Sequence, residues 1–322
     1  MAEAAAPGDA AALAPPSTLP LRVLTCQTDG TLEASVSANI ARWSSLLEAD
    51  ELTTAEIDVV HFPETAFSRY VYSSTEDLTE YGGAEEAGAG PVFAFLRALA
   101  LKFDCYVIAG FAERDTDAAC FYNSLYVVNR DASLLLTHRK IDLFPPDCVW
   151  CQPASANYTT LTLTNREGQP FKAGLILCQE LMGPQDGDHS AMLVAHHFVE
   201  TSVRAVFFSS CWPMGDGSRT FGGIWENQMQ PLVEAGREWA YFVANGCGSE
   251  PNCMTEVQWD GRYPGMRKLK ILAKRGCSGA KKYCGAAAST AGVETSELLG
   301  PGEVLPVREE GWQLHCTELR EF

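Results

Sequence analysis

Three side chains suited to nucleophilic chemistry each come directly after a predicted strand. Glu64 follows the run 57–62, Cys178 ends the run 171–177, and Lys140 closes a predicted hairpin. Chemistry in α/β proteins is usually presented at the carboxyl ends of strands. An ordinary thiol is only a few per cent thiolate at pH 7, so a nearby ammonium can favour its ionisation and a carboxylate can take its proton. The pattern predicts a thiol nucleophile assisted by a base and a cation.

Such a set is suited to attack on a carboxamide. Attack by Cys178 builds negative charge on the amide oxygen, and a fixed cation such as Lys140 stabilises that charge in a dry pocket. The leaving ammonia needs a proton, which Glu64 can supply as an acid. Water activated by Glu64 would then hydrolyse the thioester on Cys178. This chemistry requires no metal and no cofactor.

The elements that would position these residues alternate between strand and helix. Short β-branched runs bounded by turn residues predict strands, and longer runs with helical periodicity predict helices. The predicted strands are 21–27, 57–62, 106–111, 124–129, 134–139, 160–164, 171–177, 205–209 and 239–245, with a terminal hairpin at 304–307 and 312–317. The predicted helices are 35–48, 90–103, 191–200 and 226–237. This rhythm predicts an α/β fold.

Composition excludes several classes of protein. Of the 322 residues, 46% are hydrophobic and 20% charged, which is typical of a folded globular protein. The net charge of -17 would repel a phosphate backbone, so nucleic acid is an unfavourable partner. No run approaches the roughly 20 apolar residues of a membrane-spanning helix. Residues 1–20 are rich in Ala and Pro, contain no Lys or Arg, and are expected to form a disordered tail.

Twelve cysteines in a chain with no secretory signal pattern predict reduced thiols in a cytoplasmic or nuclear setting. Cys148 and Cys151 form a Cys-Xaa-Xaa-Cys pair, but no second ligand pair stands at a zinc spacing. His196 and His197 lie within a predicted helix, where satisfied structural histidines are commoner than the base of a Cys-His protease. A metal site and a protease are therefore both disfavoured.

Three segments match a known pattern when they are taken together. They read Phe-Pro-Glu-Thr-Ala-Phe at 62–67, His-Arg-Lys at 138–140 and Gly-Leu-Ile-Leu-Cys-Gln-Glu at 174–180. In this order they resemble the nitrilase superfamily, whose members hydrolyse non-peptide carbon–nitrogen bonds with a Glu, a Lys and a Cys. The resemblance implies a single-domain α-β-β-α sandwich over 21–322, with two mixed sheets flanked by helices. It also implies that Glu64, Lys140 and Cys178 are catalytic.

Further segments, at 200–212, 243–250 and 297–302, resemble the eukaryotic protein N-terminal amidases. Members of that group deamidate N-terminal Asn or Gln of proteins to Asp or Glu, which feeds an arginylation-dependent degradation pathway. The implied partners are proteins or peptides with a free N-terminal Asn or Gln. The resemblance further implies that Asp147 orients Lys140 and that Glu180 pairs with the substrate's α-ammonium.

Residues 251–282 depart from the resemblance. Eight of the 24 basic residues crowd into this stretch, which shows no apolar period, so a loop or insertion is expected there, with 283–287 resuming a core strand.

Two other functions remain open on the sequence alone. A small-molecule amidase or nitrilase would use the same triad on a free carboxamide, and a silent scaffold would keep the fold without catalysis. The intact triad argues against the scaffold. Only an enzyme directed at protein N-termini should require a free α-amine.

Overall fold

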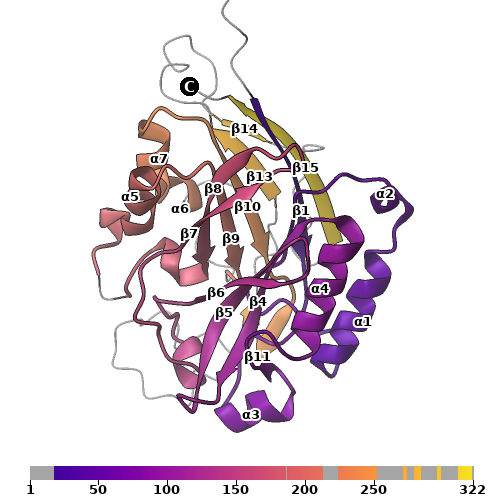
Figure 1. Ribbon diagram of the computed structural model, residues 1–322. Coiled ribbons are helices and arrows are strands. Elements are labelled where there is room, and N and C mark those ends of the chain that lie inside the picture. Colours follow the sequence, from indigo (N-terminus) through magenta and orange to yellow (C-terminus); the bar gives the residue numbers. More distant parts are fainter. Residues whose placement is uncertain are drawn as a thin grey trace, which may run out of the picture.

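Two β-sheets stacked face to face form the centre of the molecule, and helices cover their outer faces (Figure 1). The computed structural model describes residues 18–185, 187–212, 224–251, 271–273, 279–283, 296–298 and 311–320. Two mixed sheets between helical layers confirm the predicted α-β-β-α sandwich. Within the described ranges no helix is long and apolar enough to cross a membrane.

The first sheet has the strand order β15-β1-β2-β4-β5-β6, with β3 paired to β4. Its strands are β1 (Thr18–Gln27), β2 (Val59–His61), β3 (Ala84–Glu85), β4 (Tyr106–Asp115), β5 (Cys120–Val128), β6 (Leu134–Arg139) and β15 (Gly311–Arg320). Helices α1 (Val36–Leu46) and α4 (Pro91–Phe103) pack on its outer face, while α2 (Asp50–Thr53) and α3 (Thr75–Glu80) lie in its connections. Ser35 caps α1 by accepting a hydrogen bond from the backbone N–H of Ala38, so a short polar residue begins the helix.

The second sheet has the order β14-β13-β10-β9-β8-β7. Its strands are β7 (Thr160–Thr164), β8 (Pro170–Leu177), β9 (Ala205–Ser210), β10 (Trp239–Asn245), β13 (Gly279–Tyr283) and β14 (Ser296–Leu298). Helices α5 (Leu193–Glu200), α6 (Ile224–Asn227) and α7 (Gln230–Glu234) lie on its outer side (Figure 1). Strands β11 (Ser249–Pro251) and β12 (Ile271–Ala273) form a separate pair, and three short 3-10 helices are η1 (Asp147–Val149), η2 (Cys178–Leu181) and η3 (His189–Ala191).

The central strands are buried on both faces. In β2, Val59 packs into the core that joins the two sheets, and Val60 packs into the core beneath α1 and α4. Such strands read in sequence as continuous apolar runs. This explains why the central strands and their ends could be predicted.

Three of the differences between the structure and the predicted elements have a clear physical reason. β1 begins at Thr18 instead of 21, because all ten of its residues pair with β15, so 18–20 are not part of a disordered tail. The predicted helix 226–237 is two short helices, since Pro231 has no N–H with which to continue a helix. The predicted loop 251–282 contains β12 and most of β13, which pairs with β10, so the core strand runs over 279–283. The predicted strand 304–307 lies outside the described residues.

A buried histidine links the two sheets. His61 Nε2, at the end of β2, lies 2.9 Å from Ser209 Oγ of β9. Burial, together with a smaller effect of the nearby His315, lowers the pKa of His61 to about 3. The ring is therefore neutral in the folded protein.

This histidine should make stability sensitive to acid. An unfolded His takes up a proton near pH 6.5, whereas folded His61 does not until about pH 3, so its contribution to stability is lost as pH falls through that window. Between pH 7.5 and 4.5 the free energy of unfolding of the wild type should fall about 2–3 kcal/mol more than that of His61→Gln. Urea unfolding at both pH values measures this. Parallel losses in the two proteins would contradict the prediction.

Candidate active site

Glu64, Lys140 and Cys178 come from three strands but lie at one end of the stacked sheets. Glu64 follows β2, Lys140 directly follows β6, and Cys178 directly follows β8. All three are buried, with exposed fractions of 0%, 0% and 3%. The charges of Glu64 and Lys140 both act on the thiol of Cys178. The structure thus brings the three predicted residues together.

Lys140 is held between two carboxylates. Its Nζ donates to Glu64 Oε1 at 2.6 Å and to Asp147 Oδ2 at 2.7 Å, and it lies 5.8 Å from the centre of the Tyr70 ring. Burial alone would lower the pKa of Lys140, but Asp147 and Glu64 outweigh burial and raise it well above its usual value. The group therefore remains a fixed ammonium, which suits a stabiliser of negative charge.

Three donors fix both oxygens of Glu64. Oε1 accepts from Lys140 Nζ and from Asn123 Nδ2 at 2.9 Å, and Oε2 accepts from the backbone N–H of Cys211 at 2.8 Å. Burial raises the pKa of Glu64, and Lys140 offsets only part of that rise. A carboxylate with a raised pKa accepts a proton more readily than an ordinary one.

The backbone around Glu64 needs a glycine on the neighbouring strand. Gly110 of β4 donates its N–H to the carbonyl of Pro63 at 2.9 Å. A Cβ at Gly110 would lie 2.4 Å from Thr65 N and 2.5 Å from Glu64 Cα. These distances are too short for any side chain. The absence of a side chain there lets β4 seat the Glu64 turn.

Cys178 begins η2 directly after β8, in a strained backbone conformation. Its φ of +47° lies in the left-handed region, which L-residues other than Gly enter at a cost. Burial and then Glu64 raise the pKa of Cys178 well above its usual value, against the opposing effect of Lys140. The free protein therefore holds a thiol, and the ionisation expected from the neighbouring ammonium does not occur before substrate binds. Attack by Cys178 would therefore require the thiol proton to be removed.

Asp147 lies where an orienting carboxylate should be. Besides Lys140, its Oδ2 accepts from the backbone N–H of Phe144 at 2.8 Å, and its Oδ1 accepts from Asn123 Nδ2 at 3.0 Å. Asp147 begins η1 and is fully buried. This geometry supports the predicted role of holding the lysine.

Glu180 has a buried carboxylate that joins two segments of the site. Its carboxylate is 1% exposed and accepts from the backbone N–H groups of Ile141 and Leu177, each at 2.8 Å. His138 Nε2 lies 3.0 Å from the same carboxylate. These hydrogen bonds give Glu180 a positioning role, and its predicted pairing with an α-ammonium stays a prediction. Glu180 ties the residue after Lys140 to the residue before Cys178.

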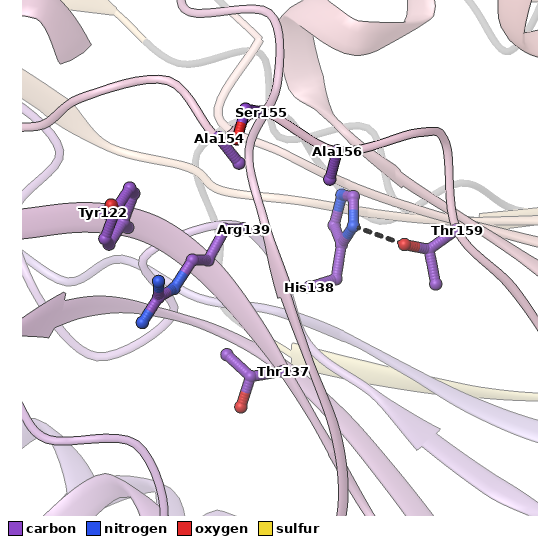
Figure 2. Close-up of a pocket in the computed structure, with 8 residues that line it drawn as sticks. All are labelled: Tyr122, Thr137, His138, Arg139, Ala154, Ser155, Ala156 and Thr159. Carbon is purple, nitrogen blue, oxygen red and sulfur yellow. Dashed lines mark hydrogen bonds between the residues drawn. The ribbon is translucent and has the colours of Figure 1, made fainter. Parts of the chain in front are cut away.

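The other ring nitrogen of His138 faces a surface hollow beside β6. Nδ1 lies 2.8 Å from Thr159 Oγ1, shown by the dashed line in Figure 2. The hollow has a volume of about 260 Å³ and is lined by Tyr122, Thr137, His138, Arg139, Ala154, Ser155, Ala156 and Thr159. None of Glu64, Lys140 and Cys178 lines it. His138 thus links the surface of the loop 154–159 to the Glu180 carboxylate, which joins the segments next to Lys140 and Cys178.

Sequence reasoning missed Asn123, His138 and Cys211, which contact the predicted site residues. Asn123 had a detectable signal, because the predicted hairpin places it opposite Lys140. The Cys148–Cys151 pair consists of reduced thiols, and the described part of the chain contains no group of three His, Cys, Asp or Glu residues that could hold a metal ion.

Comparison with known proteins finds relatives of similar sequence. A protein N-terminal amidase of Saccharomyces cerevisiae (strain ATCC 204508 / S288c) is 28% identical over 213 residues, covering 60% of this chain but only 45% of that protein. A protein of Schizosaccharomyces pombe (strain 972 / ATCC 24843) named Probable nitrilase is 30% identical over 203 residues, covering 63% of this chain and 69% of that protein.

Solved structures show the same fold. A crystal structure of N-terminal amidase with an Asn-Glu peptide has a TM-score of 0.74 and 17% sequence identity, covering 95% of this chain and 99% of that one. The family model for carbon-nitrogen hydrolases matches residues 22–186, a range that includes Glu64, Lys140, Asp147, Cys178 and Glu180. With a match over half of its length, the chain belongs to the carbon-nitrogen hydrolase family.

Proposed function

We propose that this protein hydrolyses the side-chain amide of N-terminal Asn, and of N-terminal Gln, in proteins and peptides. The observation that carries the proposal is the buried Glu64–Lys140 pair beside the Cys178 thiol. The choice of an N-terminal substrate is supported by the yeast relative named protein N-terminal amidase, and by structures of N-terminal amidase with Asn-Glu and Gln-Val peptides.

In the first half of the reaction, Cys178 Sγ attacks the amide carbon while its proton passes to Glu64. The Lys140 ammonium stabilises the negative charge that develops on the amide oxygen. Collapse of the tetrahedral species breaks the carbon–nitrogen bond, and the nitrogen leaves as ammonia with the proton from Glu64. A thioester on Cys178 results.

In the second half, Glu64 takes a proton from water as the water oxygen attacks the thioester carbon. The carbon–sulfur bond breaks, the proton returns to Cys178, and the product is a side-chain carboxylic acid. The N-terminal residue becomes Asp or Glu. We infer that such products enter arginylation-dependent protein degradation, and that the enzyme works in a reducing cytoplasmic or nuclear compartment.

A small-molecule amidase or nitrilase is the alternative. The relative named as a nitrilase is matched over 69% of its length, against 45% for the yeast N-terminal amidase. The chemistry of the triad would be the same, and only the group beside the amide would differ.

A peptide assay separates these functions. Short peptides that begin with Asn or Gln, and the same peptides N-acetylated, are incubated with wild type and with Cys178→Ala, and mass spectrometry detects the roughly one-dalton gain of deamidation. Conversion of the free peptides alone, by wild type alone, is expected. Equal conversion of the acetylated peptides would favour the small-molecule enzyme, and no conversion by folded wild type would reject the proposal.

A further inference from the structure

Asn123 is the cross-strand neighbour of Lys140. In the pairing of β5 with β6, Ser124 lies opposite Arg139, and the backbone N–H of Lys140 donates to the carbonyl of Asn123 at 2.7 Å. Directly opposite residues of an antiparallel pair project from the same face. The Asn123 side chain, 0% exposed, therefore enters the site together with the Lys140 ammonium.

Both hydrogens of the Asn123 amide are used on the two carboxylates that hold Lys140. Nδ2 donates to Glu64 Oε1 at 2.9 Å and to Asp147 Oδ1 at 3.0 Å. The opposite amide orientation would point Oδ1 at two carboxylates, so this orientation is fixed by charge. Within the described ranges Oδ1 accepts no hydrogen bond, which leaves the bridge as the polar role of this side chain.

The amide bridge opposes the repulsion between the Glu64 and Asp147 carboxylates. Two carboxylates around one ammonium carry an excess negative charge in a buried site, and like charges push each other apart. A second cation would remove the excess but would weaken Glu64 as a base. A neutral amide that donates to both oxygens restrains the carboxylates without that effect.

We propose that Asn123 is a positioning residue: it holds Glu64 and Asp147 at a fixed separation around Lys140 and so keeps the Glu64 carboxylate aimed for proton transfer with Cys178. This rests on the proposed roles of Glu64, Lys140 and Cys178.

Two substitutions test the bridge through kinetics. Asn123→Leu removes both donors at similar volume and should lower kcat about 100-fold while KM changes less than about threefold. Asn123→Asp can donate only while protonated, between two carboxylates that raise its pKa. Its kcat relative to wild type should therefore fall at least about tenfold between pH 6 and pH 9.

A matched control is Asn165→Asp. Asn165 is also buried and donates to Pro20 O and Gln169 Oε1, but it lies in the turn between β7 and β8, at the opposite end of β8 from Cys178. Its pH profile should superpose on that of wild type. A merely structural role for Asn123 would lower stability in both Asp variants and leave both profiles unchanged in shape.

A second readout needs no substrate. The rate at which iodoacetamide alkylates Cys178, followed by mass spectrometry of the peptide that contains it, should shift along the pH axis in both Asn123 variants. If wild type fails to deamidate any peptide but this shift is seen, the proposed function fails and the role of Asn123 stands. Alkylation profiles that superpose on wild type, together with kcat within threefold in folded variants, would overturn the proposal.

Discussion

Cys178→Ala is expected to abolish amide hydrolysis, by at least about 10⁴-fold, without loss of the folded state. The nucleophilic sulfur is removed, and the Glu64–Lys140–Asp147 network remains because none of its hydrogen bonds involves Cys178. Wild type is mixed rapidly with substrate and quenched in acid. Mass spectrometry should then detect an adduct on Cys178 with the mass of the peptide less ammonia. No adduct should form on Cys178→Ala.

The backbone at this position makes a second, independent prediction. Because φ is +47°, Cys178→Gly should be more stable than Cys178→Ala by about 1 kcal/mol, even though both are inactive. Urea unfolding of the two variants measures the difference. Exposed Cys148 serves as the control, since Cys148→Ala should keep full activity. Hydrolysis by Cys178→Ala, or an adduct on another cysteine, would exclude Cys178 as the nucleophile.

Lys140→Met should remove most activity, by about 10³-fold or more, and destabilise the protein by roughly 3–5 kcal/mol at neutral pH. Both carboxylates would lose the buried ammonium that they share at 2.6 and 2.7 Å. Glu64 already has a raised pKa from burial, and loss of Lys140 raises it further. A raised carboxyl pKa gives stability that is present at low pH and is lost as pH rises through it, so the deficit should shrink toward pH 5.

The matched control is Lys102→Met. Lys102 donates to Glu48 at 2.8 Å on the surface, where an ion pair is screened, so its loss should cost less than about 1 kcal/mol at either pH. If Lys140→Met does not fold, the double variant with Asp147→Asn should recover part of the stability by removing one unpaired charge. Equal unfolding free energies of Lys140→Met at pH 5 and pH 7.5 would contradict this electrostatic account.

Glu64, Lys140 and Cys178 could be selected from the sequence because each follows a strand with a clear signature. Apolar runs before Glu64 and Cys178 are buried on both faces, and the turn before β6 contains Arg130 and Asp131, so strand ends could be located. The position of Asn123 could also be predicted from the sequence. The ends of the predicted hairpin align 124 with 139, which sets 123 opposite Lys140.

Other features depend on contacts that no local pattern records. η2 brings the Glu180 carboxylate to the backbone N–H of Leu177. The other partners of this carboxylate are residues about 40 positions away. β13 contains two lysines in five residues, which hides a core strand from any search for apolar runs. The start of β1 at Thr18 is decided by its partner β15, not by its own sequence.

The pairing of β1 with β15 also bears on how the chain folds. Thr18 lies opposite Arg320, and Thr25 Oγ1 lies 2.8 Å from His315 Nε2, a contact that spans 290 residues. Contacts between residues so far apart in sequence require a large loss of loop-closure entropy before they form, and this slows folding. During synthesis, β1 has its neighbour β2 early but must wait for β15, whose His315 lies 290 residues after Thr25 in the chain. Until then its unpaired edge is exposed to pairing with other chains.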